Sequence, residues 1–296
     1  MFSPQTKKLT TTILTLAFGL TACIPYELSG AATPEMLTST PEPPTATPVP
    51  AAATVNGEII PLAEYEAELA RYKSAQAALG RIVSDEDAAR VVLEDLVSQE
   101  LLAQGARAAG LSITEADIQS RIDALAASLG GADKLSAWQS AHGYTDESFR
   151  AALQRSAEAA RMRDKIIADV PGTVEQVHAR QILLYNDAEA QNILAQLKSG
   201  AKFDELAVTV DPVTRGDLGW FPQGYLLNAN LEAAAFALQS GQFSEVISSE
   251  VGFHIVYVVE RGPHPLSPDA RLVLQGRAVT DWVSQQRAQA IILLSP

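Results

Sequence analysis

The chain has 296 residues, of which 47% are apolar and 19% charged, a composition typical of a globular protein with room for roughly two domains. Its 22 lysines and arginines against 35 acidic residues give a formal net charge of −13. Because no basic run is present that could neutralise phosphates, nucleic acid is not expected as a partner.

Residues 1–23 have the pattern of an export signal. Lys7 and Lys8 precede an apolar run from Leu9 to Leu20 that is too short to span a bilayer. The run ends in Leu-Thr-Ala-Cys, which resembles a bacterial lipobox, so Cys23 is expected to be lipidated after cleavage. Simple secretion is the alternative; an unpaired cysteine has no disulfide role in an oxidising compartment.

Residues 24–53 are rich in proline and threonine. Such a segment buries little surface and favours extended polyproline geometry. We expect a disordered, semi-rigid linker that lifts the folded part of the chain away from a surface.

Residues 54–170 are expected to form a mostly helical domain. It opens with the turn dipeptide Asn56-Gly57 and continues with apolar residues at helical spacing. Ser84 and Thr114 are positioned as N-caps, and Gly110 and Gly130 as C-terminal caps. The predicted helices are Leu62–Ala78, Asp85–Ala109, Glu115–Leu129, Ala132–Ala141 and Asp146–Asp169.

Residues 171–264 change to a mixed α+β pattern, in which the apolar period becomes two. Pro263 to Pro268 is interpreted as a linker, and residues 265–296 as a C-terminal helix that begins after Ser267, has no sheet to join and packs on the N-terminal helices. The predicted strands are Val177–Leu184 and Val251–Glu260, and the predicted short helices are Ala188–Lys198, Phe203–Val208 and Leu231–Leu238.

Five motifs between Val177 and Arg261 occur in the order and spacing of parvulin-type peptidyl-prolyl isomerases, which this part of the chain resembles. They are Val-His-Ala-Arg-Gln-Ile-Leu-Leu from Val177, Gly-Asp-Leu-Gly-Trp-Phe from Gly216, Leu-x-x-Ala-x-Phe-x-Leu from Leu231, Gly-Gln-Phe-Ser from Gly241, and Val-Gly-Phe-His-Ile-Val from Val251. The whole layout is similar to the PrsA and SurA foldases of exported proteins. The resemblance implies an α+β fold: a parvulin-like domain, with a small antiparallel sheet and flanking helices, beside a mostly helical chaperone domain completed by the C-terminal helix.

The resemblance also implies a site. Leu226, Leu231 and Phe236 match the family's proline-ring pocket, although such a trio is ordinary core elsewhere. His254 matches the polar centre, and Ser249 the hydroxyl that orients it. Asp211 matches a position near the substrate carbonyl; a residue that only initiates a turn before Pro212 is the alternative.

The chain departs from the family at Gln181, where a second histidine is usual. His178 cannot replace it, because strand side chains alternate between faces and the two positions differ by three residues. Gln181 can still donate or accept a hydrogen bond to His254, but it cannot change its protonation state. The loop from Asp211 to Gly216 is also about three residues shorter than in many relatives. We therefore expect a retained fold with weakened or altered activity.

Two functions remain open at this point. The first is a lipid-anchored prolyl isomerase and foldase that acts on unfolded exported polypeptides at the outer face of the cell membrane. The second is a non-catalytic holdase whose degenerate parvulin domain binds proline-containing segments. Neither needs a cofactor or a metal, and the sequence has no Cys/His metal spacing and no phosphate-binding loop.

Overall fold

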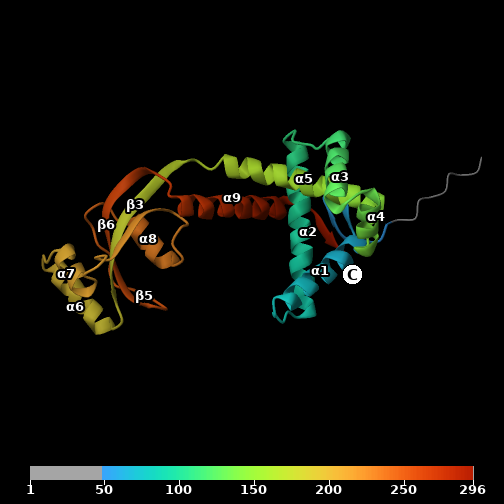
Figure 1. The fold of residues 1–296 in the computed structure, drawn as a ribbon. Coiled ribbons are helices and arrows are strands. Elements are labelled where there is room, and N and C mark those ends of the chain that lie inside the picture. The colour runs from blue at the N-terminus through green and yellow to red at the C-terminus, as the bar shows by residue number, and fades with distance from the viewer. Residues whose placement is uncertain (1–48, 296) are drawn as a thin grey trace, which may run out of the picture. The chain divides into compact units, whose positions relative to one another are not determined.

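The computed structural model describes residues 49–295 and shows an α+β protein, as predicted (Figure 1). A helical part at the N-terminal side precedes a sheet-containing part, and the chain then returns to the helical part. Cys23 and residues 24–48 of the predicted linker lie outside the described residues. The predicted linker end at residue 53 is wrong, because Ala51–Ala53 already belong to a strand that pairs with two others. The elements of the helical part are β1 (Ala51–Val55), β2 (Glu58–Pro61), α1 (Leu62–Ala78), α2 (Asp85–Ala108), α3 (Glu115–Leu129), α4 (Ala132–Ala141), α5 (Asp146–Ala168), α9 (Pro268–Gln289) and β7 (Ile292–Leu294).

The predicted helix ends of the helical part are formed by their own local hydrogen bonds. The Asp87 backbone N–H donates to the Ser84 hydroxyl at 3.1 Å, and Thr114 with Asp117 forms a reciprocal capping box. Gly130 has φ of 93°, the left-handed conformation that ends a helix. Local sequence therefore sets where these helices begin and end, and the predicted caps are confirmed.

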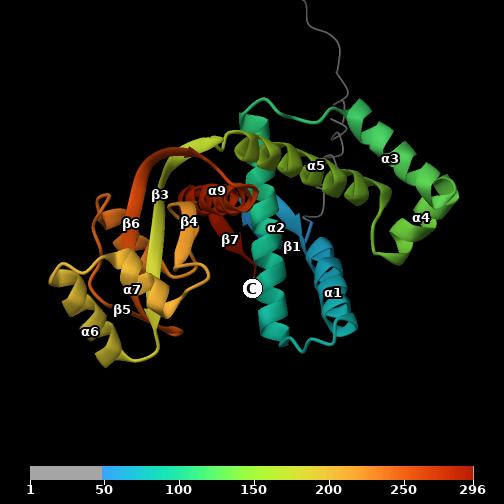
Figure 2. The same ribbon diagram turned by 60° about the vertical axis from the view of Figure 1, so that its left-hand side comes forward.

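Helices α2 and α5 cross each other and form the centre of the helical part (Figure 2). One apolar stripe of α2, which includes Val92, Leu96 and Leu101, packs on the inner face of the β1–β2 hairpin. A separate cluster joins α3, α4 and α5 around Phe149. Burial of these side chains contributes about 1.5–3 kcal/mol each, which is the main source of stability for helices of this length.

A buried network of charged side chains crosses the same helices. Glu158 of α5 is fully buried and accepts a hydrogen bond from Arg107 of α2 at 2.6 Å. Arg155 of α5 pairs with Glu100 of α2 at 3.0 Å and with Glu64 of α1 at 2.9 Å. Each buried carboxylate therefore has a cationic partner, as low-dielectric burial demands.

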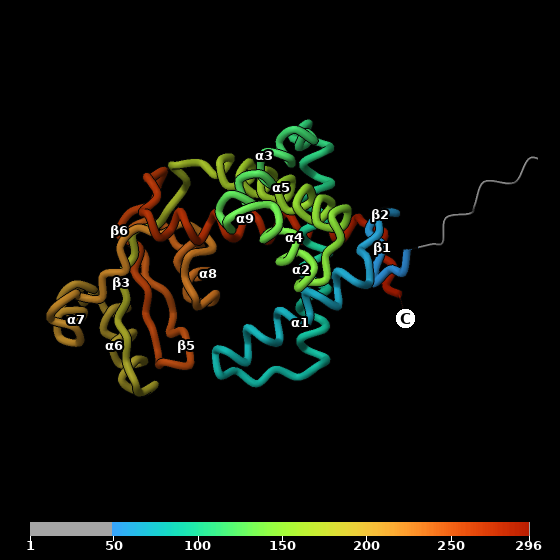
Figure 3. The backbone as a smooth tube through the Cα atoms, turned by 45° about the vertical axis from the view of Figure 1, so that its right-hand side comes forward, coloured from blue at the N-terminus to red at the C-terminus, as the bar shows by residue number. Residues whose placement is uncertain are grey.

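The C-terminal segment completes the helical part in two ways. Helix α9 contacts α2 and α5, as predicted, with Trp282 packed against Met162 and close to Gly105. The expectation that this segment joins no sheet is wrong, because β7 pairs with β1 in a three-stranded antiparallel sheet of order β2-β1-β7. Figure 3 shows the C-terminus beside β1 and β2. A strand of three residues is too short to leave a periodic signal.

The sheet-containing part is built on one long antiparallel pair. Strands β3 and β6 lie at the centre of a four-stranded sheet of order β4-β3-β6-β5. Strand β6 continues to Pro265 instead of giving way to a linker at Pro263, because it pairs with β3 as far as Thr173. The elements are β3 (Thr173–Leu184), α6 (Asp187–Lys198), α7 (Phe203–Val210), β4 (Asp217–Pro222), α8 (Ala229–Ala237), β5 (Ile247–Ser249) and β6 (Gly252–Pro265).

The two faces of this sheet carry separate apolar cores. Helices α6 and α7 cover one face, where Ile182 and Ile255 are buried. Helix α8 covers the other face, where Val177, Ala179 and Val256 are buried. Consecutive residues of β3 and β6 therefore point into different surroundings, and the face of α8 is the one that Gln181 and His254 share.

Removing one member of the buried network should destabilise the helical part. We expect Glu158→Ala to lower the free energy of opening of α2 and α5 by about 1–3 kcal/mol, because Arg107 and Gln154 lose a fully buried acceptor, although Arg107 keeps Glu58 and Glu100 as partners. Hydrogen exchange of the amides of both helices measures this change. The control Glu115→Ala removes a mostly exposed partner of Arg150 and should cost less than about 1 kcal/mol. Equal effects of the two changes would contradict a structural role for the network.

Candidate functional site

The register of β3 against β6 brings Gln181 and His254 together. Leu183 lies directly opposite His254 and Gln181 opposite Val256, so Gln181 and His254 are diagonal neighbours on one face. Only 4% of the His254 surface is exposed. Its Nδ1 lies 2.8 Å from Gln181 Oε1, and its Nε2 lies 2.7 Å from the Ser249 hydroxyl.

The contact with Gln181 defines the tautomer of His254, and burial favours the neutral ring. Because Gln181 Oε1 can only accept, Nδ1 carries the proton, and Nε2 of the neutral ring accepts from the Ser249 hydroxyl. Burial lowers the pKa of His254 below its usual value. The Ser249 hydroxyl also lies 3.2 Å from the Gly252 carbonyl oxygen, an alternative acceptor if Nε2 becomes protonated.

His178 lies on the opposite side of β3, as the alternation of strand side chains predicts. Its Nε2 is 2.8 Å from Asp217 Oδ1, and its ring stacks on Trp220 at 5.7 Å. It takes no part in the contacts of His254. Gln181 is therefore the side chain of β3 that occupies the position facing the buried imidazole.

Asp211 organises the loop between α7 and β4. It follows the last residue of α7, and its carboxylate accepts hydrogen bonds from the backbone N–H groups of Val213, Thr214 and Gly216 and from the Thr214 hydroxyl. These bonds lower the pKa of Asp211 to about 2, with the Thr214 hydroxyl the largest cause. The turn-forming role is thus present, and the same residue also lines a cavity of about 330 Å³ that Gln181 lines.

The short loop is attached closely to β3 at Gly216. The Gln181 backbone N–H donates to the Gly216 carbonyl oxygen at 2.8 Å, and a Cβ at Gly216 would lie 1.7 Å from the Gln181 carbonyl oxygen. Gly216 also has φ of 67°. Only glycine fits this position, and its presence fixes the loop beside the Gln181 backbone.

The three residues of the predicted proline pocket gather on the same face as His254. Leu231 of α8 is buried, and Leu226 and Phe236 are half-buried and pack against the same cluster. The Phe236 ring lies edge-on to Phe221 with centroids 6.1 Å apart. Leu226 and Phe236 therefore combine support from the core with partial exposure, which a ring-binding surface requires.

Glu232 holds the loop that carries Leu226, a role that sequence analysis missed. Its carboxylate accepts from the Gly224 backbone N–H at 2.7 Å and from the Leu226 backbone N–H at 2.9 Å. On the other side, Arg261 donates to the Phe236 carbonyl oxygen at 3.0 Å. An acidic residue in the first turn of a helix is the only sequence signal for Glu232, and it is shared by most helices of this chain.

No group of three or more metal-ligating side chains occurs within residues 49–295. In the same range, no helix is long and apolar enough to cross a bilayer. The site therefore consists of one neutral imidazole with two hydrogen-bond partners, a loop carboxylate and an apolar surface.

Comparison with known proteins identifies two domains in the chain. Residues 184–260 match the model of the PPIC-type PPIase domain, and residues 1–163 match that of the SurA-like N-terminal domain. The site therefore lies in a parvulin-type rotamase domain. The chain belongs to the family of proteins with a SurA-like N-terminal domain, because that match covers more than half of its length.

Similar proteins include chaperones and foldases. Chaperone SurA of Thiobacillus denitrificans is 34% identical over 45% of this chain and 35% of its own length. Foldase protein PrsA of Caldanaerobacter subterraneus is 28% identical over 56% of this chain and 55% of its own. The match thus spans about a third to a half of the length of these relatives.

Two solved structures resemble parts of the chain. The peptidylprolyl isomerase PrsA from Bacillus cereus has a TM-score of 0.43 at 20% identity and covers 79% of this chain and 87% of its own. The parvulin of Nitrosopumilus maritimus is 36% identical, with a TM-score of 0.27, over 29% of this chain and 98% of its own.

We expect His254 to titrate below 6.5, the usual midpoint of histidine, in the folded protein. Because its folded pKa is depressed, the stability it contributes is complete above pH 6.5 and is lost as the pH falls through the folded pKa. NMR titration of the ring resonances measures the midpoint, with the urea-unfolded chain as the reference. A folded midpoint at or above the reference would contradict the buried, neutral state.

Proposed function

We propose that the protein is a peptidyl-prolyl cis-trans isomerase and foldase that assists unfolded exported polypeptides outside the cytoplasmic membrane. The observation that carries this proposal is the position of a buried, neutral His254 on the same sheet face as the apolar surface of Leu226, Leu231 and Phe236. Both belong to a PPIC-type domain. The similar SurA and PrsA proteins support the role in folding.

The reaction needs an apolar, water-poor site more than it needs proton transfer. Rotation about a peptide bond meets a barrier of about 18–20 kcal/mol, and X-Pro bonds isomerise in tens to hundreds of seconds unaided. No covalent bond breaks. A site that holds the proline ring and removes water from the carbonyl favours the twisted amide, and each ~1.4 kcal/mol of such stabilisation gives a tenfold rate.

Four polar residues have separate proposed roles in this site. His254 lies under the twisted amide, and Gln181 and Ser249 fix its ring and tautomer through hydrogen bonds at 2.8 and 2.7 Å. Asp211 holds the loop that closes the cavity beside Gln181. Gln181 thus preserves the contact to Nδ1 that orients the ring, although it cannot exchange a proton with it.

The second candidate is a non-catalytic holdase that binds proline-containing segments. Gln181 favours it, because this position facing His254 cannot titrate. The short loop from Asp211 to Gly216 also favours the holdase. The Asp211 carboxylate already accepts hydrogen bonds from the backbone of this loop. In this case the apolar surface would bind the ring without accelerating its rotation.

Exchange NMR on a proline peptide separates the two candidates. We expect the purified protein to accelerate cis/trans exchange, and His254→Ala to lower the catalysed rate by about tenfold, equivalent to ~1.4 kcal/mol. Gln181→His should raise the rate if a second imidazole is what limits activity. The control His264→Ala, at the far end of β6, should leave the rate unchanged.

No acceleration by the unaltered protein would exclude the isomerase. Suppression of the aggregation of an unfolded client would then support the holdase, and failure of both assays would contradict the proposed function as a whole.

We also propose that the protein is anchored to the outer face of the cell membrane by a lipid on Cys23. The lipobox-like sequence and the proline- and threonine-rich segment after it support this proposal; residues 1–48 lie outside the described residues. We expect Cys23→Ser to move the protein from the membrane to the soluble fraction, because the variant lacks the thiol that would carry the lipid anchor. Unchanged fractionation, or labelling with palmitate that persists in Cys23→Ser, would contradict it.

A further inference from the structure

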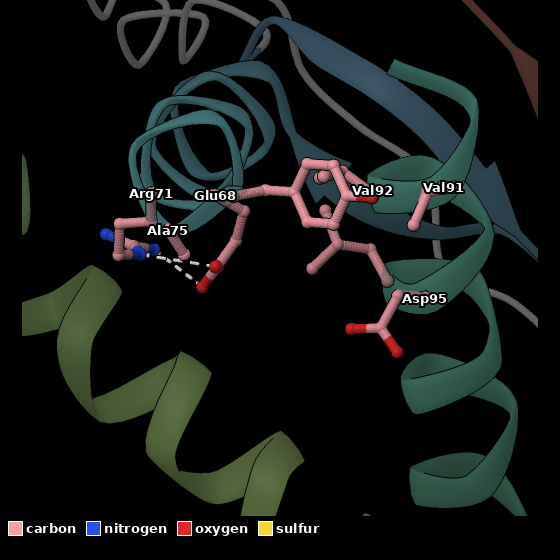
Figure 4. A pocket seen from close by; sticks show the side chains of 8 residues that line it. Glu68, Arg71, Ala75, Val91, Val92 and Asp95 are labelled. Atoms are coloured by element: carbon pink, nitrogen blue, oxygen red, sulfur yellow. Dashed lines mark hydrogen bonds and ion pairs between the residues drawn. The ribbon is translucent and has the colours of Figure 1, made fainter. Parts of the chain in front are cut away.

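A cavity of about 470 Å³ lies between α1 and α2, away from the rotamase domain in the sequence and in its lining. Figure 4 shows Glu68, Arg71 and Ala75 of α1 on one side, and Val91, Val92 and Asp95 of α2 on the other. Tyr72 and Leu96 complete its wall. Most of the wall is apolar, although no residue of α1 is fully buried. The two helices thus leave apolar side chains accessible between them.

The charges at this cavity do not balance. Arg71 is already engaged, because its guanidinium pairs with Glu68 at 2.5 Å and donates to the Tyr144 hydroxyl at 2.9 Å. Asp95 has neither a hydrogen bond nor an ion pair with any side chain of residues 49–295. Partial burial and the negative charge of Glu68 raise the pKa of Asp95 above its usual range. One carboxylate at an apolar surface therefore lacks a cationic partner.

The apolar surface continues on the other side of α2. A second cavity, of about 450 Å³, lies between α2 and α9, and Val91 and Asp95 line both cavities. Val279 and Val283 of α9 contribute apolar surface to it. Its polar lining also includes Glu94 and Ser98 of α2 and Thr280, Ser284 and Arg287 of α9. The half-buried Val91 and the exposed Asp95 thus lie between two cavities that both contain apolar surface. Such a surface accommodates several consecutive residues of a bound chain, not a single side chain.

We propose that these two adjoining cavities form a binding groove for an unfolded, apolar polypeptide segment that carries a lysine or arginine, with the basic side chain paired to Asp95. The occupant follows from charge complementarity with Asp95. A cation beside Asp95 removes an unfavourable interaction with Glu68, and the −13 charge of the whole chain attracts basic segments and repels acidic ones. Apolar neighbours of the basic residue would cover Tyr72, Val92 and Val279.

This groove rests on the chaperone half of the proposed function and not on the isomerase. It needs no proline in the client, and it uses no residue of the rotamase domain. The bound segment is defined by its chemistry. Its apolar residues supply the buried contact area, and its single positive charge sets where along the groove the segment binds. An acidic segment of equal hydrophobicity would place two like charges together at Asp95 and is disfavoured.

The test is fluorescence anisotropy of the full chain with three short, proline-free peptides of leucine and serine. They are identical except for a central residue, which is lysine, norleucine or glutamate. We expect the lysine peptide to bind about two- to fivefold more tightly than the norleucine peptide, as for a partly exposed ion pair, and the glutamate peptide to bind most weakly. The preference for lysine should decrease with added salt.

Variants of residues in the groove test whether the peptide binds there. Asp95→Asn should remove the difference between lysine and norleucine peptides, whereas Asp164→Asn, an exposed carboxylate of α5 outside both cavities, should preserve it. Ala75→Trp fills the α1–α2 cavity and should weaken all three peptides, whereas Ala77→Trp, on the same helix outside the lining, should not. His254→Ala should leave binding unchanged, so that failure of the isomerase and failure of the groove give different results.

Equal affinity of the unaltered protein for the lysine and glutamate peptides would overturn the proposal without any variant. Binding that Ala75→Trp leaves unchanged in a protein with a normal circular dichroism spectrum would also overturn it.

Discussion

The antiparallel pairing of β3 with β6 is the interaction on which the rotamase domain depends. Twelve consecutive residues of β3, from Thr173 to Leu184, have partners in β6. Because strand side chains alternate, this pairing gives each face its own core, and it places Gln181 diagonally opposite His254. A shift of one residue would move His254 under α6 and α7, away from the apolar residues of α8. Sheet register therefore places Gln181 beside His254. Helix α8 and the loop before it add the apolar residues Leu226, Leu231 and Phe236.

Elements with a strong local signal could be predicted from the sequence, and those that depend on distant partners could not. Helices α2 and α3 follow the N-cap residues Ser84 and Thr114, which can be recognised from the sequence around each helix start. Strand β7 has only three residues and forms because it can pair with the edge of β1, a strand far away in the sequence. The buried pairing of Glu158 with Arg107 joins residues 51 positions apart, and helical periodicity alone assigns no partner to a charged residue. Sequence order identified the residues around His254, and the structure supplied their contacts and the support of Leu226 by Glu232.

Gln181 shows how a departure from a family pattern can retain part of its physical role. A histidine at this position could donate, accept or titrate, whereas the amide oxygen of Gln181 only accepts from Nδ1. That single contact is enough to select the tautomer in which Nε2 accepts a hydrogen bond from the Ser249 hydroxyl. What is lost is a second titratable group. An isomerase that works through shape and exclusion of water tolerates this loss, whereas a mechanism that needed proton exchange between two imidazoles would not.

In the proposed function, one sheet face binds proline and accelerates its isomerisation. The most direct measurement is an NMR titration of the isotope-labelled protein with a proline peptide, combined with exchange spectroscopy on the peptide in the same samples. We expect chemical-shift changes centred on Leu226, Leu231, Phe236 and His254, together with cis/trans exchange peaks at substoichiometric protein. Exchange peaks absent at every protein concentration, or shift changes confined to the face covered by α6 and α7, would contradict it.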